Sequence, residues 1–279
     1  MRSGFLSIAC YNEFMTAFLC PVCRQKLKRV GGSAVCESGH VFDYSKEGYL
    51  NLLTAADKNS LDPGDNKDMV LARKSFLDAD YYLPLAEAID ATLAEFFQGK
   101  SYTLLDAGVG TGYYLSHITN ATKKIGVDIS KHAVRYAARE NKDAECAVAS
   151  VYALPIESES VDAVTCIFSP YAFEEYYRIL KKGGVLVVAS PRENHLIELR
   201  RALYDNVREV DNKLQTDVFA KLQDKAVTFR FEIEGADGIA SLVKMTPYAY
   251  RAPKENIDKL CERESLSLTA DFWVSVFEK

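Results

Sequence analysis

Three cysteines and one histidine near the start of the chain have the spacing of a zinc site. Cys20, Cys23, Cys36 and His40 follow the pattern C-x2-C-x12-C-x3-H. Because Zn2+ prefers four sulfur or nitrogen donors in a tetrahedron, two short pairs on separate turns supply a complete ligand set. The alternative is a set of structural cysteines beside a surface histidine, but the chain has only seven cysteines and four histidines. Their concentration at this spacing predicts a bound zinc ion that holds a binding surface in place.

Basic residues occupy the segment between the two ligand pairs. Arg24, Lys26, Lys28 and Arg29 fall within six residues. In an isolated β-hairpin they would simply be solvated, whereas on a zinc-stabilised unit exposed cations are suited to contact nucleic-acid phosphates. The net charge of −5 argues against a general nucleic-acid binder, although residues 1–75 carry a small excess of Lys and Arg. We therefore predict these four residues as candidate RNA contacts.

A glycine-rich loop with acidic residues on either side indicates an adenosine-binding site. Asp106 is followed by Gly108, Gly110 and Gly112, and Asp128 ends the next strand-like run. Glycines let the backbone turn sharply out of a parallel strand and let a ligand lie against bare main chain. A carboxylate at the end of the second strand accepts both hydroxyls of a ribose. A dinucleotide loop would read G-x-G-x-x-G, so NAD chemistry is the less favoured alternative.

Apolar strands and amphipathic helices alternate around this loop. The strand-like runs are TLLDAG (103–108), KIGVDI (124–129), ECAVAS (145–150), VDAVTCIFS (161–169) and VLVVAS (185–190). Because helix-like stretches separate them, they predict a Rossmann-like, doubly wound and mostly parallel sheet of the α/β class.

The segments before and after this alternation also have recognisable patterns. Residues 69–98 have helical periodicity that is interrupted at Tyr81, Tyr82 and Pro84, which indicates two helices with a bend. After the fifth strand we expect a helix over 195–207 and two final strands, VTFRFEIEG and LSLTADFWVSVFEK. Further helices are expected between those strands, near 236–245 and 254–264.

The composition is that of a globular protein of the cytoplasm. The 279 residues are 48% hydrophobic, which suffices for one large domain with a small appendage. Cysteines outside the zinc pattern are isolated, which suits buried thiols in a reducing compartment better than a disulfide framework. No apolar run approaches the length of a membrane span, and the N-terminal apolar stretch is too short for a signal peptide. We expect a cytoplasmic location and no membrane partner.

The glycine loop, with an acid two positions ahead of its first glycine, resembles motif I of class I S-adenosylmethionine-dependent methyltransferases. SVYALP (150–155) and LKKGGVLVV resemble later landmarks of that class. From residue 18 onward, CPVC, CESGHVFDYSKEGYLNLL, DPGDNKDMVLARKSFLDADYY, PRENHLIEL and MTPYAYRA resemble one family along almost the whole chain. That family is the bacterial 23S rRNA (guanine-N1)-methyltransferases, which includes macrolide-resistance enzymes of the tylosin type.

The resemblance implies an activity, a cofactor and partners. Members of the family use an N-terminal zinc domain to recognise a hairpin in 23S rRNA, and they methylate N1 of one guanine. They are homodimers in which two zinc domains flank an RNA-binding cleft. On this chain the resemblance implies the zinc ligands named above and S-adenosylmethionine contacts by Tyr82, Gly110, Thr111 and His195, to which the class pattern adds Asp106, Gly108 and Asp128. Without the resemblance, Tyr82 would be interpreted as a core aromatic residue.

These patterns leave the catalytic residues open. Guanine N1 carries a proton, so a general base or stabilisation of charge on O6 is required. Ser169 and Tyr171 follow the fourth strand at the edge where ligands bind in such sheets, and Asp65 is a more remote base candidate. Tyr171 can instead cap the next helix, and His195 can serve only to begin one. Arg192 follows the fifth strand at the same edge and is a further candidate RNA contact.

The chain is therefore divided into four segments with one predicted function. We expect an N-terminal extension (1–18), a zinc-binding RNA-recognition domain (19–56), a linker (57–75) and a methyltransferase domain (76–279). The predicted function is methylation of guanine N1 in a 23S rRNA hairpin. One alternative is a small-molecule methyltransferase, which would give the basic zinc unit no role. The other is a non-catalytic RNA-binding protein on a methyltransferase fold, which the intact set from Asp106 to Asp128 disfavours.

Overall fold

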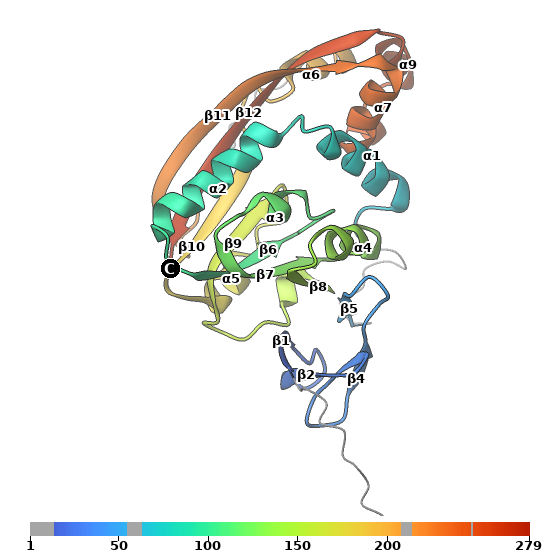
Figure 1. Ribbon diagram of the computed structural model, residues 1–279. Coiled ribbons are helices and arrows are strands. Elements are labelled where there is room, and N and C mark those ends of the chain that lie inside the picture. The colour runs from blue at the N-terminus through green and yellow to red at the C-terminus, as the bar shows by residue number, and fades with distance from the viewer. Residues whose placement is uncertain (1–13, 55–62, 208–213, 247) are drawn as a thin grey trace, which may run out of the picture.

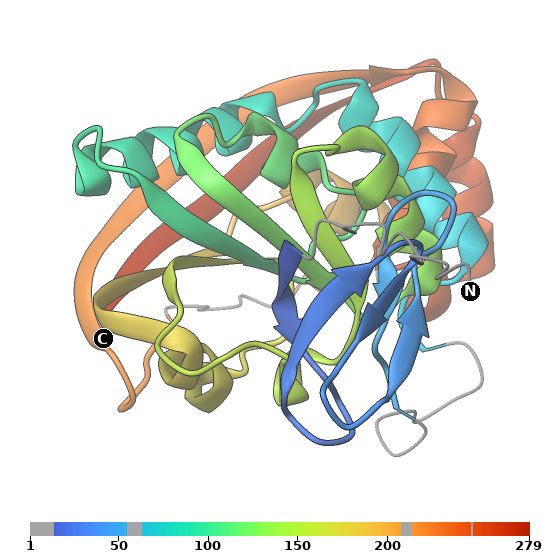
Figure 2. The ribbon, with the colours of Figure 1, turned by 60° about the horizontal axis from the view of Figure 1, so that its bottom comes forward.

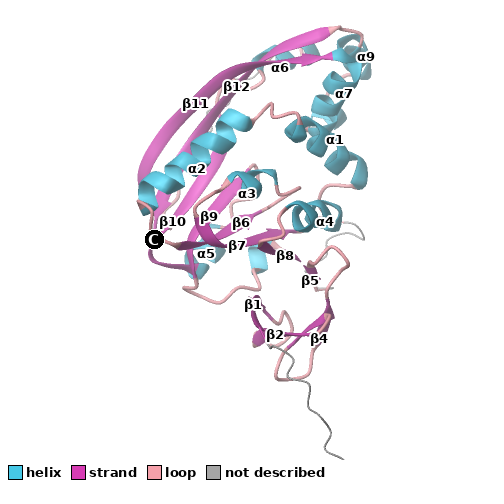
Figure 3. Cartoon of the chain, viewed as in Figure 1, coloured by secondary structure: helices cyan, strands magenta, loops and turns pink. Residues whose placement is uncertain are grey.

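Two sheets, one small and one large, organise the described part of the chain (Figure 1, Figure 3). The computed structural model describes residues 14–54, 63–207, 214–246 and 248–279. None of the helices in these ranges combines the length and the apolar character that crossing a bilayer requires.

The small sheet is antiparallel and lies at the N-terminal end of the described chain. Its strands, in spatial order, are β1 (Phe14–Leu19), β2 (Lys26–Val30), β3 (Ser33–Val35) and β4 (Val41–Asp43). We call residues 14–49 the ribbon. The first strand lies inside the range 1–18 that was expected to be an extension, and that boundary is corrected because Phe18 is buried in the core. Residues 1–13 lie outside the described residues.

The large sheet has the spatial order β11-β12-β10-β9-β6-β7-β8-β5. Strands from β10 to β5 are parallel, and β12 and β11 are antiparallel at the opposite edge. The chain winds outward from β6 through β7 and β8 and then returns to β9 and β10, which confirms the predicted doubly wound fold. The bounds are β5 (Leu50–Asn51), β6 (Tyr102–Ala107), β7 (Ala121–Asp128), β8 (Ala144–Val148), β9 (Val161–Ile167), β10 (Leu180–Pro191), β11 (Ala220–Glu234) and β12 (Ser265–Glu278).

The helices agree with the sequence pattern except at some ends. They are α1 (Lys67–Asp78), α2 (Leu83–Phe97), α3 (Tyr113–His117), α4 (Lys131–Glu140), α5 (Phe173–Ile179), α6 (Ile197–Leu203), α7 (Gly235–Met245), α8 (Tyr248–Arg251) and α9 (Lys254–Cys261). The predicted bend separates α1 from α2. Helix α1 begins inside the expected linker 57–75, because Asn66 caps it by accepting a hydrogen bond from the Met69 N–H at 3.0 Å. The linker is therefore corrected to end at Asn66.

Side chains of the large sheet alternate between two cores. On β6, Leu104 packs with α1, α2 and the other helices of one face, and Leu105 packs with α5 and the ribbon on the other face. This alternation follows from the two-residue period of a strand. Figure 1 and Figure 2 both show the ribbon, in blue, against the end of the sheet that carries β8 and β5.

The ribbon is joined to the large sheet by direct contacts. The Leu19 N–H donates to the Pro155 carbonyl at 2.7 Å, and the Ala17 N–H donates to Glu145 Oε2 at 2.8 Å. Phe18 forms a β-bridge with Ile156. Buried apolar contacts continue without a break from the ribbon into the sheet. The ribbon is therefore a covering layer of the sheet, because it shares the sheet's hydrophobic core.

Candidate zinc site and cofactor cavity

The predicted zinc ligands converge on one point at one end of the ribbon, where the β1–β2 and β3–β4 turns meet. The ligand atoms of Cys20, Cys23, Cys36 and His40 all lie within 4.8 Å of one another. His40 Nδ1 is 3.3 Å from Cys36 Sγ and 3.6 Å from Cys20 Sγ, and the Sγ atoms of Cys23 and Cys36 are 3.6 Å apart. A tetrahedron with Zn–S near 2.3 Å and Zn–N near 2.0 Å has edges of about 3.5–3.8 Å. The residues therefore fit a zinc ion bound through three sulfurs and His40 Nδ1.

Two tight turns place these ligands. In the first, the Arg24 N–H donates to the Cys20 carbonyl at 2.8 Å, and Arg24 has a positive φ of 61°. In the second, the Gly39 N–H donates to the Cys36 carbonyl at 3.0 Å, with Gly39 at φ 81°. Both sharp turns are closed by short-range backbone bonds, so the site is specified by local sequence.

Two of the basic residues between the ligand pairs also contact the large sheet's side of the structure. Arg24 Nη2 donates to the Leu154 carbonyl at 3.0 Å, and Lys26 Nζ forms an ion pair with Glu157 Oε2 at 2.8 Å. These contacts attach the ribbon to the segment after β8. Arg29 instead lies over the Tyr44 ring at 4.5 Å from its centroid and is exposed. Of the predicted RNA contacts on the ribbon, Arg24 and Lys26 are therefore also anchors between the two sheets.

The glycine loop leaves β6 with its backbone bare to the adjoining space. Gly108 and Gly112 both have a φ of 85°, which side chains rarely tolerate. A Cβ on Gly108 would lie 2.1 Å from Ser169 Oγ, and one on Gly112 would lie 2.8 Å from Ala137 Cα. The loop therefore requires glycine at these positions both for its conformation and for the close approach of β9 and α4.

Asp128 supports this loop from the end of β7. Its Oδ2 accepts a hydrogen bond from the Gly110 N–H at 2.9 Å, and its Oδ1 accepts one from the Ser130 N–H at 2.8 Å. Burial raises the pKa of Asp128, and the two backbone donors oppose that shift. Each carboxylate oxygen retains a lone pair, so Asp128 has the acceptors that a ribose diol requires.

Asp106 lies deeper than the glycine loop, and its predicted contact with the cofactor remains a prediction. Its carboxyl group is buried beneath the loop and accepts a hydrogen bond from Thr165 Oγ1 at 2.8 Å. Burial raises its pKa to about 7. Asp106 is not among the residues that line the cavities described next. In this position the carboxyl group supports the loop through its hydrogen bond with Thr165.

Two adjoining cavities open beside the glycine loop. The smaller cavity is about 300 Å3 and the larger about 740 Å3. Asp128 and Tyr152 line the smaller cavity only, and Tyr82 and His195 line the larger one only. The residues that line both are Asp65, Arg73, Gly108, Gly110, Thr111, Ile167, Phe168, Ser169 and Pro170. The arrangement suits an elongated ligand that crosses the loop at the topological switch point of the sheet.

Tyr82 and His195 meet inside the larger cavity, although they lie far apart in the chain. The Tyr82 hydroxyl is 3.4 Å from His195 Nε2, and the Asp271 N–H donates to His195 Nδ1 at 3.4 Å. Burial, followed by the charge of Arg200, lowers the pKa of His195 to about 3. Burial also raises the pKa of Tyr82. Both groups are therefore uncharged at neutral pH and available as hydrogen-bond partners.

All three catalytic candidates from the sequence line the larger cavity. Ser169 Oγ is buried without a hydrogen-bond partner and faces Gly108. Tyr171 is 40% exposed and stacks on Phe173. Asp65 Oδ2 forms an ion pair with Arg73 Nη2 at 3.0 Å. The structure thus places Asp65 beside the glycine loop, closer than the sequence indicated.

Arg192 does not belong to this set. Its guanidinium forms an ion pair with the buried Asp271 at 2.8 Å and lies over the Trp273 ring, 4.4 Å from the centroid. Those contacts use the side chain to hold β12 against the end of β10. The prediction that Arg192 contacts RNA stays a prediction, and these contacts give the side chain a structural role as well.

Two residues of the cavities were missed by sequence reasoning. Phe168 has a positive φ of 54°, is 44% exposed and lines both cavities. Such strain in a bulky residue is typical of functional sites, but no sequence pattern reports it. Arg73 lies inside the helical periodicity of α1, where a single charge is usually solvated. Only the fold turns it toward the glycine loop.

Comparison with known proteins agrees with both parts of this structure. A family model described as "RlmA, N-terminal", a zinc ribbon, matches residues 18–61, and one described as "Methyltransferase domain" matches residues 105–188. A Bacillus subtilis (strain 168) protein named "Putative 23S rRNA (guanine-N(1)-)-methyltransferase YxjB" is 33% identical over 269 residues, covering 91% of this chain and 94% of that protein. The 23S rRNA (guanine(748)-N(1))-methyltransferase of Streptomyces fradiae is 36% identical over 189 residues, covering 66% of each chain.

These matches extend over the zinc ribbon and the doubly wound sheet together. The fold, the cofactor class and the zinc-binding unit are therefore those of an S-adenosylmethionine-dependent enzyme with a zinc ribbon. Because the Bacillus subtilis relative is 33% identical along nearly the full length of both proteins, this chain belongs to the 23S rRNA (guanine-N1)-methyltransferase family.

Proposed function

We propose that the protein transfers a methyl group from S-adenosylmethionine to N1 of one guanine in a hairpin of 23S rRNA. The observation that carries this proposal is the zinc ribbon built onto the same core as the cofactor sheet. The Bacillus subtilis relative that bears this activity in its name matches 91% of this chain, a length that takes in most of both the ribbon and the sheet. A small-molecule methyltransferase would have no use for the ribbon.

The chemistry requires alignment and the removal of one proton. Bound S-adenosylmethionine supplies an electrophilic methyl carbon on a sulfonium. Guanine N1 attacks that carbon in line, the N1–CH3 bond forms as the S–CH3 bond breaks, and the N1 proton leaves to a base. The protein must also hold the guanine outside its stack, which is least costly for a loop nucleotide.

Residues of the larger cavity have the properties for these steps. The exposed Tyr171 ring at the rim offers a flat surface for a base, and burial raises the pKa of its hydroxyl, so the hydroxyl remains a donor. The Asp65 carboxylate and the Ser169 hydroxyl both face the cavity and are oxygen acceptors for the N1–H edge. We assign Asp65 as the candidate base, because it is the carboxylate that lines the cavity among the described residues.

We also infer that the active form is a cytoplasmic homodimer. The family resemblance implies the dimer, and the isolated cysteines favour a reducing compartment. Light scattering coupled to size-exclusion chromatography measures the mass directly. A mass near the 31.1 kDa of one chain at micromolar concentration would overturn the dimer.

The decisive experiment is methylation of rRNA from a strain that lacks the gene. Purified enzyme and S-adenosylmethionine are added to this rRNA, and nucleoside mass spectrometry with primer extension locates the product. We expect one N1-methylguanosine in a hairpin of 23S rRNA, formed more slowly by the Asp128→Asn variant when S-adenosylmethionine is limiting. Methylation of a different nucleoside, or of small molecules only, would contradict the proposal.

A further inference from the structure

The two cavities contain few positive charges for a ligand that carries a carboxylate. Among the described residues that line them, the basic side chains are Arg73 and His195. His195 is neutral at pH 7, because burial lowers its pKa to about 3. Arginine remains protonated throughout the physiological range. Arg73 is therefore the one permanent cation on the described lining of either cavity.

Arg73 lies where the two cavities join. It is on α1, and it lines both cavities together with Gly108 and Gly110. Its Nη2 atom contacts Asp65 Oδ2 at 3.0 Å and the Met245 carbonyl at 3.5 Å. Both contacts use the same nitrogen, and a guanidinium has further donors on Nε and Nη1 in a fixed fork. The contacts therefore orient the group without using all of its donors.

We propose that Arg73 binds the α-carboxylate at the amino-acid end of S-adenosylmethionine. This inference rests on the proposed function only for the identity of the cofactor, and not on the RNA substrate. The glycine loop beside Arg73 is the surface on which that end of the cofactor must lie if Asp128 holds the ribose. The ion pair with Asp65 Oδ2 orients the guanidinium, in addition to the role of Asp65 as the candidate base.

Guanine O6 is the other acceptor that Arg73 could contact, and the structure favours the carboxylate. A carboxylate brings a full negative charge into a half-enclosed site and must be paired there. Guanine O6 gains only partial charge, during the reaction, and neutral donors such as Tyr171 can meet that need. Arg73 also lines the smaller cavity beside Asp128, which is the side away from the Tyr171 rim.

The test compares two ligands that differ only in the carboxylate. S-adenosylhomocysteine carries it, and S-adenosyl-3-thiopropylamine lacks it. Isothermal titration calorimetry of the purified full chain without RNA gives the dissociation constant of each. For Arg73→Gln we expect S-adenosylhomocysteine to bind roughly 10- to 100-fold more weakly, the loss typical of a charge-assisted hydrogen bond. The analogue without the carboxylate should bind within about 2-fold of wild type.

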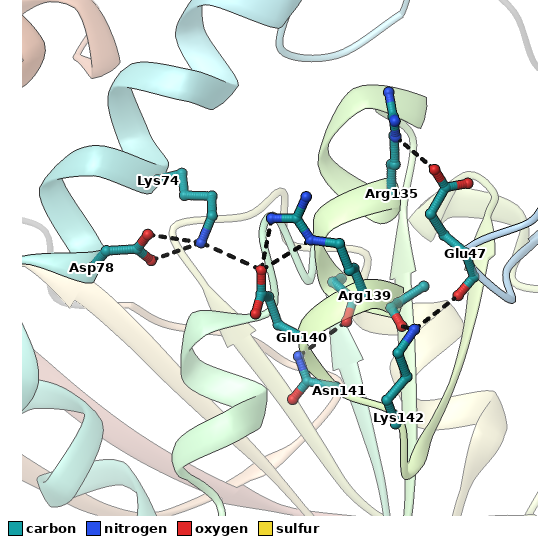
Figure 4. A network of polar contacts seen from close by, with 10 residues as sticks. Glu47, Lys74, Asp78, Arg135, Arg139, Glu140, Asn141 and Lys142 are labelled. Atoms are coloured by element: carbon teal, nitrogen blue, oxygen red, sulfur yellow. Dashed lines mark hydrogen bonds and ion pairs between the residues drawn. The ribbon is translucent and has the colours of Figure 1, made fainter.

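Lys74, the next residue of the same helix, provides a matched control. Its Nζ contacts Asp78 Oδ2 at 2.7 Å and Glu140 Oε1 at 3.7 Å (Figure 4). Lys74 is not among the residues that line the two cavities. Lys74→Gln removes the same charge from α1 and should leave both dissociation constants unchanged. If Lys74→Gln weakens the binding of S-adenosylhomocysteine as much as Arg73→Gln does, the loss comes from the general charge of α1 and the proposal is wrong.

Further variants keep the proposal falsifiable. Arg73→Lys retains the charge without the planar fork of donors, so its dissociation constant for S-adenosylhomocysteine should lie between those of wild type and Arg73→Gln. Arg73→Lys is also the variant to measure if Arg73→Gln does not fold. If Arg73→Gln binds both ligands equally more weakly, or binds both as wild type does, the proposal is overturned. No weakening together with a lower rate of RNA methylation would assign Arg73 to guanine O6 instead. Failure to methylate rRNA with normal ligand discrimination would contradict the proposed function alone.

Discussion

The zinc site and the cofactor cavity are built in opposite ways. The four zinc ligands lie within 21 residues of sequence, on two turns that close through short-range hydrogen bonds. The cavities are assembled from α1, α3, the end of α7, and the carboxyl ends of β6, β7, β9 and β10 with the loops that follow them. The first site depends on local geometry and a metal ion, whereas the second depends on the order of strands in a sheet.

The two sites are nevertheless parts of one folded body. Cys20 and Cys36 are buried in the same core as Leu105 and Val127 of the strands that carry the cofactor loop. A substitution that disturbs the packing at one site can therefore also change the other site through this shared core. Experiments that separate binding of zinc, cofactor and RNA show how far each site is independent.

Removal of one zinc ligand should have the largest effect. Cys23→Ser leaves three ligands, and because a structural zinc ion contributes folding energy to its unit, RNA methylation should fall on the order of 1000-fold or more. Bound zinc, measured by metal analysis, should be lost, while S-adenosylhomocysteine still binds. Cys261→Ser, at a cysteine remote from the site, is the control. Loss of cofactor binding together with zinc would show that the ribbon is needed to hold the sheet.

The buried carboxyl group of Asp106 should make stability depend on pH. Its pKa is raised from an ordinary value of 3.8 to about 7, so the folded state retains a proton that the unfolded state releases. The free energy of unfolding should therefore fall as pH rises from about 4 to about 7, by up to about 4 kcal/mol. Denaturant unfolding of wild type and Asp106→Asn across this range measures the difference. Parallel curves for the two proteins would refute this assignment.

Asp128→Asn should affect the cofactor side alone. The amide replaces one acceptor with a donor beside the Gly110 and Ser130 N–H groups, so binding of S-adenosylhomocysteine should weaken about 30-fold. Zinc content should equal that of wild type. Calorimetry and metal analysis on the same sample check both statements, and loss of zinc from this variant would count against separable sites.

The smallest effect is expected at Tyr82. Tyr82→Phe removes the hydroxyl near His195 but keeps the ring among Phe76, Phe231 and Phe272. Cofactor affinity should fall about 5-fold, the value of one neutral hydrogen bond, with the unfolding midpoint nearly unchanged. An unchanged affinity with a lower unfolding midpoint would make Tyr82 a core residue only, which is the interpretation that the sequence pattern alone favours.

Much of the fold followed from patterns with a local physical cause. Alternating apolar strands and amphipathic helices predicted the doubly wound sheet, and Pro84 after Tyr82 predicted the break between α1 and α2. The errors occurred where a distant segment decides the outcome. From the sequence, Phe18 is placed in an N-terminal extension, whereas in the structure it forms a β-bridge with Ile156. The sequence likewise gives no sign of the ion pair between Arg192 and Asp271, which lie far apart in the chain.

The two sites give the clearest division between sequence and tertiary structure. The sequence by itself determined the zinc ligands, the glycine loop and Asp128, because ligand spacing, bare backbone and strand ends are properties of short segments. Only the tertiary structure decided that Arg73, Phe168 and Asp65 join Gly108 at one cavity, and that Asp106 lies beneath it. These placements depend on the order in which strands pair and on which face each helix covers, and no short segment contains that information.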